Sequence, residues 1–248
     1  MEILAGFLIG AIIGITGVGG GVVTAPMLIL FFGMSPVQSV GTALLFSAVV
    51  KVGSTLVYLV RRQVDFRVLG WMLAGGAPGA LIGSLLLTHV RGLRESGVVL
   101  AIIGASVVSA AMLGLRGVRR GDRPAQPHPA RLPWFTFPIG LEVGFSSAGA
   151  GALGSLLMLQ CTALPPVRVV GTDLMFGLGL SLIGGSVHLA AGNWDQPALL
   201  LLVLGGVAGA PLGALAAGRI PAKPLRTGLL LWSALLGGVL LVQGLFYR

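Results

Sequence analysis

The stretch GITGVGGGVVTAP, residues 14–26, contains five glycines and a closing proline inside an otherwise apolar N-terminal run. In a helix interior, glycine costs about 1 kcal/mol and proline about 3 kcal/mol relative to alanine. A continuous helix is therefore disfavoured across these residues. The stretch predicts that the N-terminal run breaks into two shorter helices, the second of which begins near Val22.

The composition of the 248 residues is that of an integral membrane protein. Hydrophobic residues make up 55% of the chain, charged residues make up 9%, and the mean hydropathy is +0.99. A soluble domain carries about 25% charged residues. Apolar runs of about twenty residues, long enough to cross a bilayer, recur along the chain. The arginines behind the net charge of +9 lie in short connections between these runs, as juxtamembrane charges do. We therefore expect a lipid bilayer as partner and no nucleic acid.

An internal repeat divides the chain into two homologous halves. Residues 36–46 read PVQSVGTALLF and residues 166–176 read PVRVVGTDLMF, an offset of 130 with seven of eleven positions identical. The halves span about 1–115 and 134–248, and a basic, proline-rich linker at 116–133 joins them. Duplicated halves are the usual architecture of secondary transporters.

Each half is expected to contain a glycine-interrupted run followed by three transmembrane helices. The second interruption, SSAGAG at 146–151, precedes a helix that begins near Ala152. The interrupted runs cover 3–32 and 134–163, and the expected helices cover about 36–60, 67–88, 93–115, 166–191, 196–217 and 223–246.

The positions of the arginines predict that the interrupted runs are re-entrant hairpins. If each run crossed the membrane once, a cytoplasmic linker would place the basic loop at 217–226 outside, against the positive-inside rule. Re-entrant runs place that loop, the linker and Arg61 in the cytoplasm, and leave the Asp195 loop outside. Only the mildly basic loop at 89–95, which this arrangement places outside, departs from the positive-inside rule. The predicted fold is an all-α, multi-pass protein of the inner (cytoplasmic) membrane with two inverted repeats.

Broken helices at membrane depth suit an anion. Unpaired backbone groups are tolerated there only when they are buried in protein or line a wet cavity. A helix N-terminus also carries about half a positive charge. Two tips that enter from opposite faces would meet near the midplane, where inverted-repeat transporters hold their substrate. Ser146 and Ser147 would add hydroxyl donors at the second tip.

Two charged residues lie inside predicted spans. Lys51 precedes Arg61 by ten residues, or about 15 Å, and so lies near mid-bilayer, where charge is costly and is usually functional. Asp173 follows Pro166 by seven residues, or about 10 Å, and is a candidate for coupling or gating. The predicted substrate-binding residues are Gly17, Gly19, Gly20, Gly21, Thr42, Lys51, Ser146, Ser147, Gly149, Gly151 and Thr172.

Each of these functional predictions has a structural alternative. Glycines also allow helices to pack closely, and this is the role expected for GAPGALIGS at 76–84 and GVAGAPLGA at 206–214. Lys51 could form a structural ion pair or contact backbone carbonyls. Asp173 could have a hydrated structural role, and the threonine hydroxyls could bond to their own helix.

The sequence contains no pattern that indicates an enzyme. Cys161 is the single cysteine, and the three histidines are scattered without ligand spacing, so no metal site is expected. No nucleophile and base cluster at membrane depth, and no nucleotide-binding loop is present, so no catalytic residue or cofactor is expected either. We expect Asp65 and Asp195 to cap or link helices, and Tyr58 and His188 to form hydrogen bonds near helix ends.

These motifs resemble those of the sulfite exporter TauE/SafE family, also called the toluene-sulfonate uptake permeases. The resemblance covers nearly the whole chain and rests on G-x-x-G-V-G-G-G with its following proline, GTALLF and GTDLMF, RRQVDFR and AAGNWD, and the two later Gly-rich runs. Lys51 is similar to a lysine found in part of the family. SSAGAG departs from the fuller pattern, and Leu156 occupies the position that matches Pro26. The resemblance implies transport of anions such as sulfite, sulfoacetate or aryl sulfonates.

We therefore expect a secondary transporter that carries small sulfur-containing anions across the cytoplasmic membrane by alternating access. One alternative is a transporter or channel for another small ion or a carboxylate. Another is a membrane enzyme or a non-transporting accessory protein. The sequence leaves open the particular anion, import or export, the coupling ion and the oligomeric state.

Overall fold

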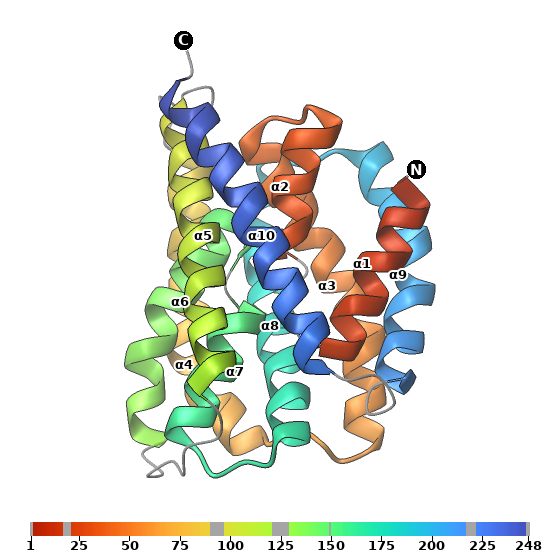
Figure 1. Ribbon diagram of the computed structural model, residues 1–248, viewed down its shortest axis with the longest axis vertical. Coiled ribbons are helices and arrows are strands. Elements are labelled where there is room, and N and C mark those ends of the chain that lie inside the picture. The colour runs from red at the N-terminus through yellow and green to blue at the C-terminus, as the bar shows by residue number, and fades with distance from the viewer. Residues whose placement is uncertain are drawn as a thin grey trace.

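The protein is a helical bundle in a computed structural model (Figure 1), which describes residues 2–16, 21–89, 97–120, 129–148, 150–216 and 222–246. Within these ranges the secondary structure consists of ten α-helices and one 3-10 turn, η1, without a strand. Six of the described helices (α3, α4, α5, α8, α9 and α10) are long and apolar enough to cross a membrane. The bounds are α1 Glu2–Thr16, α2 Gly21–Phe32, α3 Pro36–Val60, α4 Phe66–His89, α5 Gly97–Arg120, η1 Pro129–Arg131, α6 Leu132–Ser146, α7 Ala150–Cys161, α8 Pro166–Ala190, α9 Gln196–Ala216 and α10 Ala222–Leu245.

The predicted all-α membrane fold is confirmed, and most helix ends follow local signals in the sequence. α3 begins after Ser35, whose hydroxyl accepts a hydrogen bond from the Gln38 amide at 3.4 Å, and Pro36 occupies its first turn, where a fixed φ favours the helix. α5 differs from its expected range because it continues to Arg120. Arginine is a good helix former, so the GVRR tail extends the helix beyond the apolar run.

Both glycine-rich runs are broken helices, as predicted. The first run forms α1 and α2, and the second forms α6 and α7. These helices have 12 to 15 residues, which is about 18–22 Å at 1.5 Å per residue. A hydrocarbon core is about 30 Å thick, so none of the four spans it alone.

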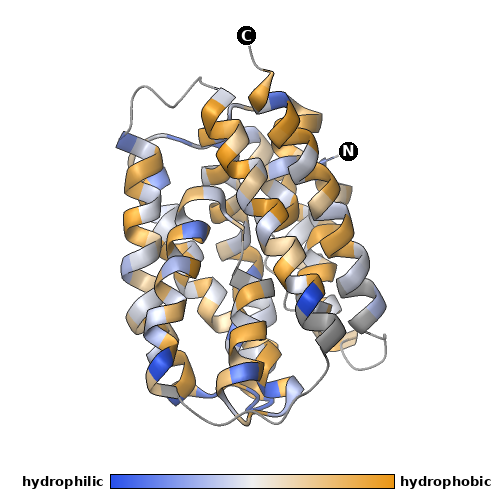
Figure 2. Ribbon diagram, turned by 60° about the vertical axis from the view of Figure 1, so that its left-hand side comes forward, coloured by the Kyte–Doolittle hydropathy of each residue, from blue (hydrophilic) through white to orange (hydrophobic). Residues whose placement is uncertain are grey.

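The two hairpins enter the bundle from opposite ends. In Figure 1 both chain termini lie at the upper end, from which α1 descends and α2 returns, whereas α6 rises from the lower end and α7 returns to it. Hydrophobic residues line the long helices between the two ends (Figure 2). This arrangement agrees with two re-entrant hairpins. The opposite orientation of the two halves in a bilayer stays a prediction.

The first arm of each hairpin packs on a helix of the other half. α6 lies against α4, where a Cβ atom at Gly79 would collide with the carbonyl oxygen of Phe137. α1 lies against α9 in the same way, because a Cβ atom at Gly209 would collide with the carbonyl oxygen of Phe7. The two contacts are related by the offset of 130. The packing role expected for the Gly-rich runs of α4 and α9 is confirmed.

Candidate functional site

The two helix interruptions touch each other in the interior of the bundle. Gly21 is the first residue of α2, and a Cβ atom there would collide with the carbonyl oxygen and the hydroxyl of Ser147, just after α6. The adjacent residues Val22 and Ala148 are fully buried. The N-terminus of a 12-residue helix therefore lies against the end of the opposing half-helix, away from water.

Ser147 has an unusual conformation and an unused hydroxyl. Its φ of 61° places it in the left-handed region, which costs a residue other than glycine about 1–3 kcal/mol. Its amide donates to the carbonyl of Val143, which closes the end of α6. The side chain is buried, yet the hydroxyl has no hydrogen-bond partner among the described residues. A strained backbone and an unpaired polar atom are features of ligand-binding positions.

Ser146 and Gly151, two other predicted residues of this tip, lie beside Ser147 or one turn beyond. The Ser146 hydroxyl accepts a hydrogen bond from the Ala148 amide at 3.2 Å and donates one to the Glu142 carbonyl at 3.0 Å. Gly151 is buried in the first turn of α7. The remaining predicted glycines lie outside the described residues: Gly17, Gly19, Gly20 and Gly149.

Lys51 supplies a buried positive charge on α3. Only 2% of the residue is exposed, and its Nζ atom donates a hydrogen bond to the Ser181 hydroxyl on α8 at 3.3 Å. No ion pair links Lys51 to a carboxylate within the described part of the chain. An ammonium group has three N–H donors. Because the Ser181 hydroxyl uses one of them, the others are available for hydrogen bonds to an anion.

Asp173 connects α8 to the second hairpin. It is 1% exposed, and its Oδ2 atom accepts a hydrogen bond from the Ser155 hydroxyl on α7 at 2.6 Å. Its Oδ1 atom lies against Gly154. α7 therefore covers the Asp173 carboxylate, and its coupling, gating or structural role stays a prediction.

Thr42 and Thr172 form reciprocal contacts between the two halves. The Thr42 hydroxyl oxygen accepts a hydrogen bond from the Asp195 amide, and the Thr172 oxygen accepts one from the Asp65 amide, both at 2.9 Å. Each aspartate also caps the helix that follows its loop, as expected. Both threonines are fully buried. The structure thus places these hydroxyls at the loops of the opposite half, and their contact with substrate stays a prediction.

Tyr58 and His188, also related by the offset, lie near the ends of α3 and α8. The Tyr58 hydroxyl donates to the carbonyl oxygen of Gly14 in the first hairpin at 3.4 Å. His188 is fully buried against Gly41, and its ring also interacts with the backbone of Gly144. The predicted hydrogen bond is confirmed for Tyr58, and for His188 it stays a prediction.

Sequence reasoning missed two residues of this interior, Glu142 and Ser155. It noted Ser181 as a hydroxyl on its helix but did not connect it to Lys51, of which Ser181 is the counterpart at the offset of 130. Glu142 is an acidic residue in an apolar run, which is also a recognisable signal; its Oε1 atom is buried without a partner among the described residues. Nothing in the sequence marks Ser155 as functional, since serine is common in membrane helices.

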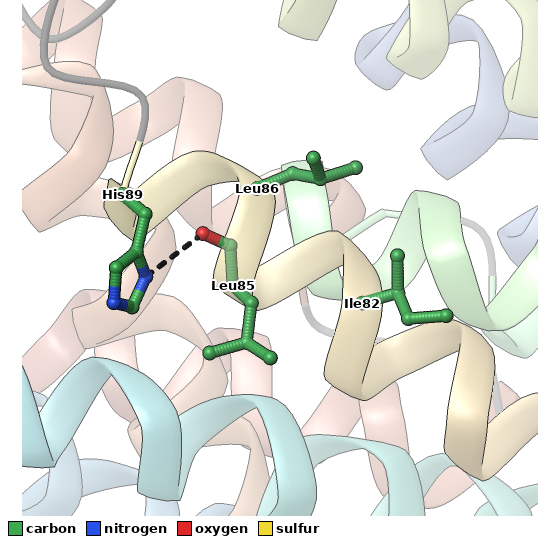
Figure 3. Close-up of a pocket in the computed structure, with 4 residues that line it drawn as sticks. All are labelled: Ile82, Leu85, Leu86 and His89. Atoms are coloured by element: carbon green, nitrogen blue, oxygen red, sulfur yellow. Dashed lines mark hydrogen bonds between the residues drawn. The ribbon is translucent and has the colours of Figure 1, made fainter.

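Two surface cavities lie away from this interior. Ile82, Leu85, Leu86 and His89, all on α4, line an apolar groove, and the His89 Nδ1 atom lies 3.2 Å from the Leu85 carbonyl oxygen (Figure 3). The lining is almost entirely aliphatic, which suits lipid chains better than an anion. The second cavity adjoins the loops after α3 and α7 and is lined by Asp65, Arg67, Val68, Cys161, Thr162, Ala163 and Leu164.

Comparison with known proteins agrees with this membrane architecture. The sequence model of the family described as "Sulfite exporter TauE/SafE" matches residues 2–240. The chain belongs to the TauE/SafE family. No solved structure matches this TauE/SafE chain.

Curated relatives match the TauE/SafE chain over most of its length. "Probable membrane transporter protein YjnA" of Bacillus subtilis is 25% identical over 254 residues, which cover 98% of the chain and 97% of the relative. "Probable membrane transporter protein ORF9" of Sinorhizobium sp is 31% identical over 233 residues, with coverage of 90% and 85%. "Probable membrane transporter protein YunE" of Bacillus subtilis is 26% identical over 267 residues, with coverage of 98% and 97%. This TauE/SafE protein is therefore a multi-pass membrane transporter.

Proposed function

We propose that the chain is a secondary transporter of small sulfur oxyanions or organosulfonates, which it moves across the cytoplasmic membrane by alternating access. The observation that carries the proposal is the contact between the two broken helices, where Gly21 at the start of α2 lies against the Ser147 hydroxyl, which has no hydrogen-bond partner among the described residues. The first amides of a helix lack intrahelical partners and point toward this junction.

The charges around the junction favour an anion over a cation. The N-terminal end of α2 carries a partial positive charge, and hydroxyl and amide groups donate strong hydrogen bonds to ionised oxygens. Lys51 adds a full positive charge in the same interior, with the neutral Ser181 hydroxyl as its hydrogen-bond acceptor. The family is named for sulfite export, and this name suggests the substrate class. Sulfite and sulfonates fit such a site because they present several anionic oxygens on one sulfur atom.

The packing of the hairpins supports a rigid-body form of alternating access. The backbones of α6 and α4, and of α1 and α9, touch at glycines. Such close contacts keep each hairpin arm and its partner helix together during a movement. The contact between Gly21 and Ser147 is small by comparison, so the two tips can separate while each arm stays on its own partner helix.

Transport into sealed proteoliposomes tests the proposal. We expect saturable movement of radiolabelled sulfite and competition by a panel of sulfonates. Lys51→Glu should abolish anion transport, because it replaces the buried cation with a buried carboxylate, whereas Arg168→Glu reverses a charge at an exposed position of α8 and should retain it. A cation transporter would keep its flux in Lys51→Glu.

Thermal unfolding with added anions provides an independent measurement. A ligand that binds only the folded protein raises the midpoint of unfolding, so sulfite or a sulfonate should stabilise the wild type and have no effect on Lys51→Glu. Absence of both stabilisation and transport for every sulfur anion, in protein shown to be folded, would contradict the proposed function.

A further inference from the structure

Each interruption places a negative helix end beside the proposed anion site. α1 ends at Thr16, and α6 ends at Ser146, one residue before the contact between Ser147 and Gly21. The last four carbonyl groups of a helix have no intrahelical partner, and this end carries about half a negative charge. Uncovered carbonyls would repel an anion and would oppose the positive start of α2.

Hydroxyl groups of neighbouring helices cover the same carbonyl in both hairpins. The Tyr58 hydroxyl on α3 donates to the carbonyl oxygen of Gly14 at 3.4 Å, and the Ser84 hydroxyl on α4 donates to that of Gly144 at 3.1 Å. The two glycines are related by the offset of 130, and each lies in the last turn of its arm. Tyr58 is 3% exposed and Ser84 is fully buried, so neither hydrogen bond is open to water.

A second hydroxyl donates to a carbonyl one turn before the end of each arm. The Thr16 hydroxyl donates to the carbonyl of Ile12 at 2.7 Å, and the Ser146 hydroxyl donates to that of Glu142 at 3.0 Å. These residues are again two pairs at the offset of 130. The C-terminal ends of α1 and α6 therefore each receive two hydroxyl donors.

The two hairpins reach this common arrangement with different residues. The counterpart of Ser84 is Ala214, which has no hydroxyl, and the counterpart of Tyr58 is His188, whose ring also interacts with the backbone of Gly144. The covered carbonyl thus occupies the same position in both halves, although its hydroxyl donor does not. Covering this carbonyl is a shared feature of the two ends and not one copied contact.

We infer that Tyr58 and Ser84 are positioning residues that set the affinity of the transporter for anions, because they cover the negative ends of the two half-helices. The inference rests on the proposed function and adds a determinant of its charge selectivity. Each hydroxyl acts through the carbonyl that it binds and not by contact with the substrate. Loss of either hydroxyl uncovers a negative dipole end at the site, so an anion binds more weakly. A doubly charged anion is affected more than a singly charged one, because the energy is proportional to the charge.

The experiment measures transport by the full chain in proteoliposomes, with two probes in the same alkaline buffer. Methanesulfonate is a monoanion, and sulfite is mostly a dianion under these conditions. Ser84→Ala should raise the KM for methanesulfonate by about three- to tenfold, as expected for a partly buried helix-dipole interaction, and should retain kcat. The factor for sulfite should be larger. Tyr58→Phe should act in the same direction but less strongly, because its hydrogen bond is longer.

Ser54→Ala is the matched control, because it removes a hydrogen bond of the same kind without uncovering a helix end. The Ser54 hydroxyl is fully buried and donates to the carbonyl of Ala210 on another helix at 3.3 Å. Ala210 lies inside the continuous helix α9. The substitution should lower thermal stability to an extent similar to that of Ser84→Ala, and it should leave the KM for both anions unchanged.

Tyr58→Phe keeps the aromatic ring, so it keeps the inference testable if Ser84→Ala does not fold. Unchanged KM values in the folded variants would overturn the inference while leaving anion transport intact. Equal factors for methanesulfonate and sulfite, or the same rise in KM in Ser54→Ala, would also overturn it, because either result indicates a general loss of packing. Absence of transport for every sulfur anion by the wild type would instead overturn the proposed function and the inference with it.

Discussion

At the scale of single residues, Ser147 combines two unfavourable features in one position. Its left-handed backbone, and its buried hydroxyl without a partner among the described residues, both lower the stability of the folded protein. Glycine would remove both at once, because it adopts positive φ without strain and has no polar side chain. Serine at this position is therefore explained better by ligand binding than by folding.

Ser147→Gly and Ser147→Ala separate these two contributions. Both variants should bind sulfite more weakly, by roughly tenfold or more, since a hydrogen bond to a charged group contributes about 1.5–3 kcal/mol. Ser147→Ala should gain stability through loss of the buried hydroxyl, and Ser147→Gly should gain up to about 1 kcal/mol more through relief of backbone strain. Calorimetric titration and thermal unfolding measure the two effects. Unchanged sulfite affinity in both variants would remove Ser147 from the binding site.

Thr42 distinguishes a structural role from a substrate contact. Thr42→Val leaves the partly buried Asp195 amide without its acceptor and should lower stability by about 1 kcal/mol or more. Thr42→Ser keeps the oxygen and should restore stability. The KM for sulfite of folded Thr42→Val should equal that of the wild type. A raised KM with normal stability would return Thr42 to the predicted substrate-binding set.

Sequence reasoning identified residues whose charge is unexpected inside an apolar membrane helix. Lys51 is recognisable because a cation ten residues from a helix end must be buried, and the structure buries it. The role of Thr42 was not predictable, because its partner lies 153 residues away and donates through a backbone amide. The role of Ser155 was not predictable for a similar reason. A serine in a membrane helix is common, and only the structure identifies Asp173 as its partner.

At the scale of helices, glycine has two separate functions in this protein. Glycines at 14–26 interrupt a helix, whereas glycines in α4 and α9 lie inside continuous helices and bring backbones together. The density of glycine distinguishes the two cases. Four of the five residues 17–21 are glycine, which is too many for a helix interior, while α4 and α9 space theirs about one turn apart.

A pair of substitutions in α4 tests the packing function. Gly79→Ala should destabilise the protein strongly, because the new methyl group would collide with the Phe137 carbonyl in α6. Gly70→Ala is the control in the same helix, where a Cβ atom meets nothing within 4 Å. It should be neutral or stabilising by up to about 1 kcal/mol, because alanine favours the helix. Thermal unfolding in detergent compares them, and equal losses would refute the close packing.

The partners of the helices were harder to predict than the helices themselves. Hydropathy located each apolar run, and proline or polar residues marked most ends. Nothing in the periodicity of the first run indicated that α1 would pack on α9, because an all-apolar helix has no distinct face for its partner. The choice depends on matching glycines in two segments about 200 residues apart, which a single sequence does not reveal.

At the scale of the whole molecule, the repeat and the arginine distribution together predict opposite orientations for equivalent positions. Arg61 and Ala191 are related by the offset of 130 and are both exposed after the first long helix of their halves. In Figure 1 the loops that follow α3 and α8 lie at opposite ends of the bundle. Inversion therefore places Arg61 in the cytoplasm and Ala191 outside.

Cysteine labelling tests this orientation in cells. In a Cys161→Ala background, a maleimide that does not cross membranes should label Ala191→Cys and Ser35→Cys in intact cells. It should label Arg61→Cys and Ala163→Cys only after the membrane is opened. Labelling of Arg61→Cys and Ala191→Cys from the same face would show that the halves are parallel.

The way each hairpin arm docks on the opposite half also bears on the origin of the molecule. A single half, made alone, would expose the glycine faces of its hairpin arm and of its second long helix to lipid, and could cover them only against a second copy. That copy would have to be inserted upside down. If the halves are inverted as predicted, the expected ancestor before gene duplication is a dual-topology homodimer, and fusion would allow features such as Lys51 and Asp173 to arise on one side only.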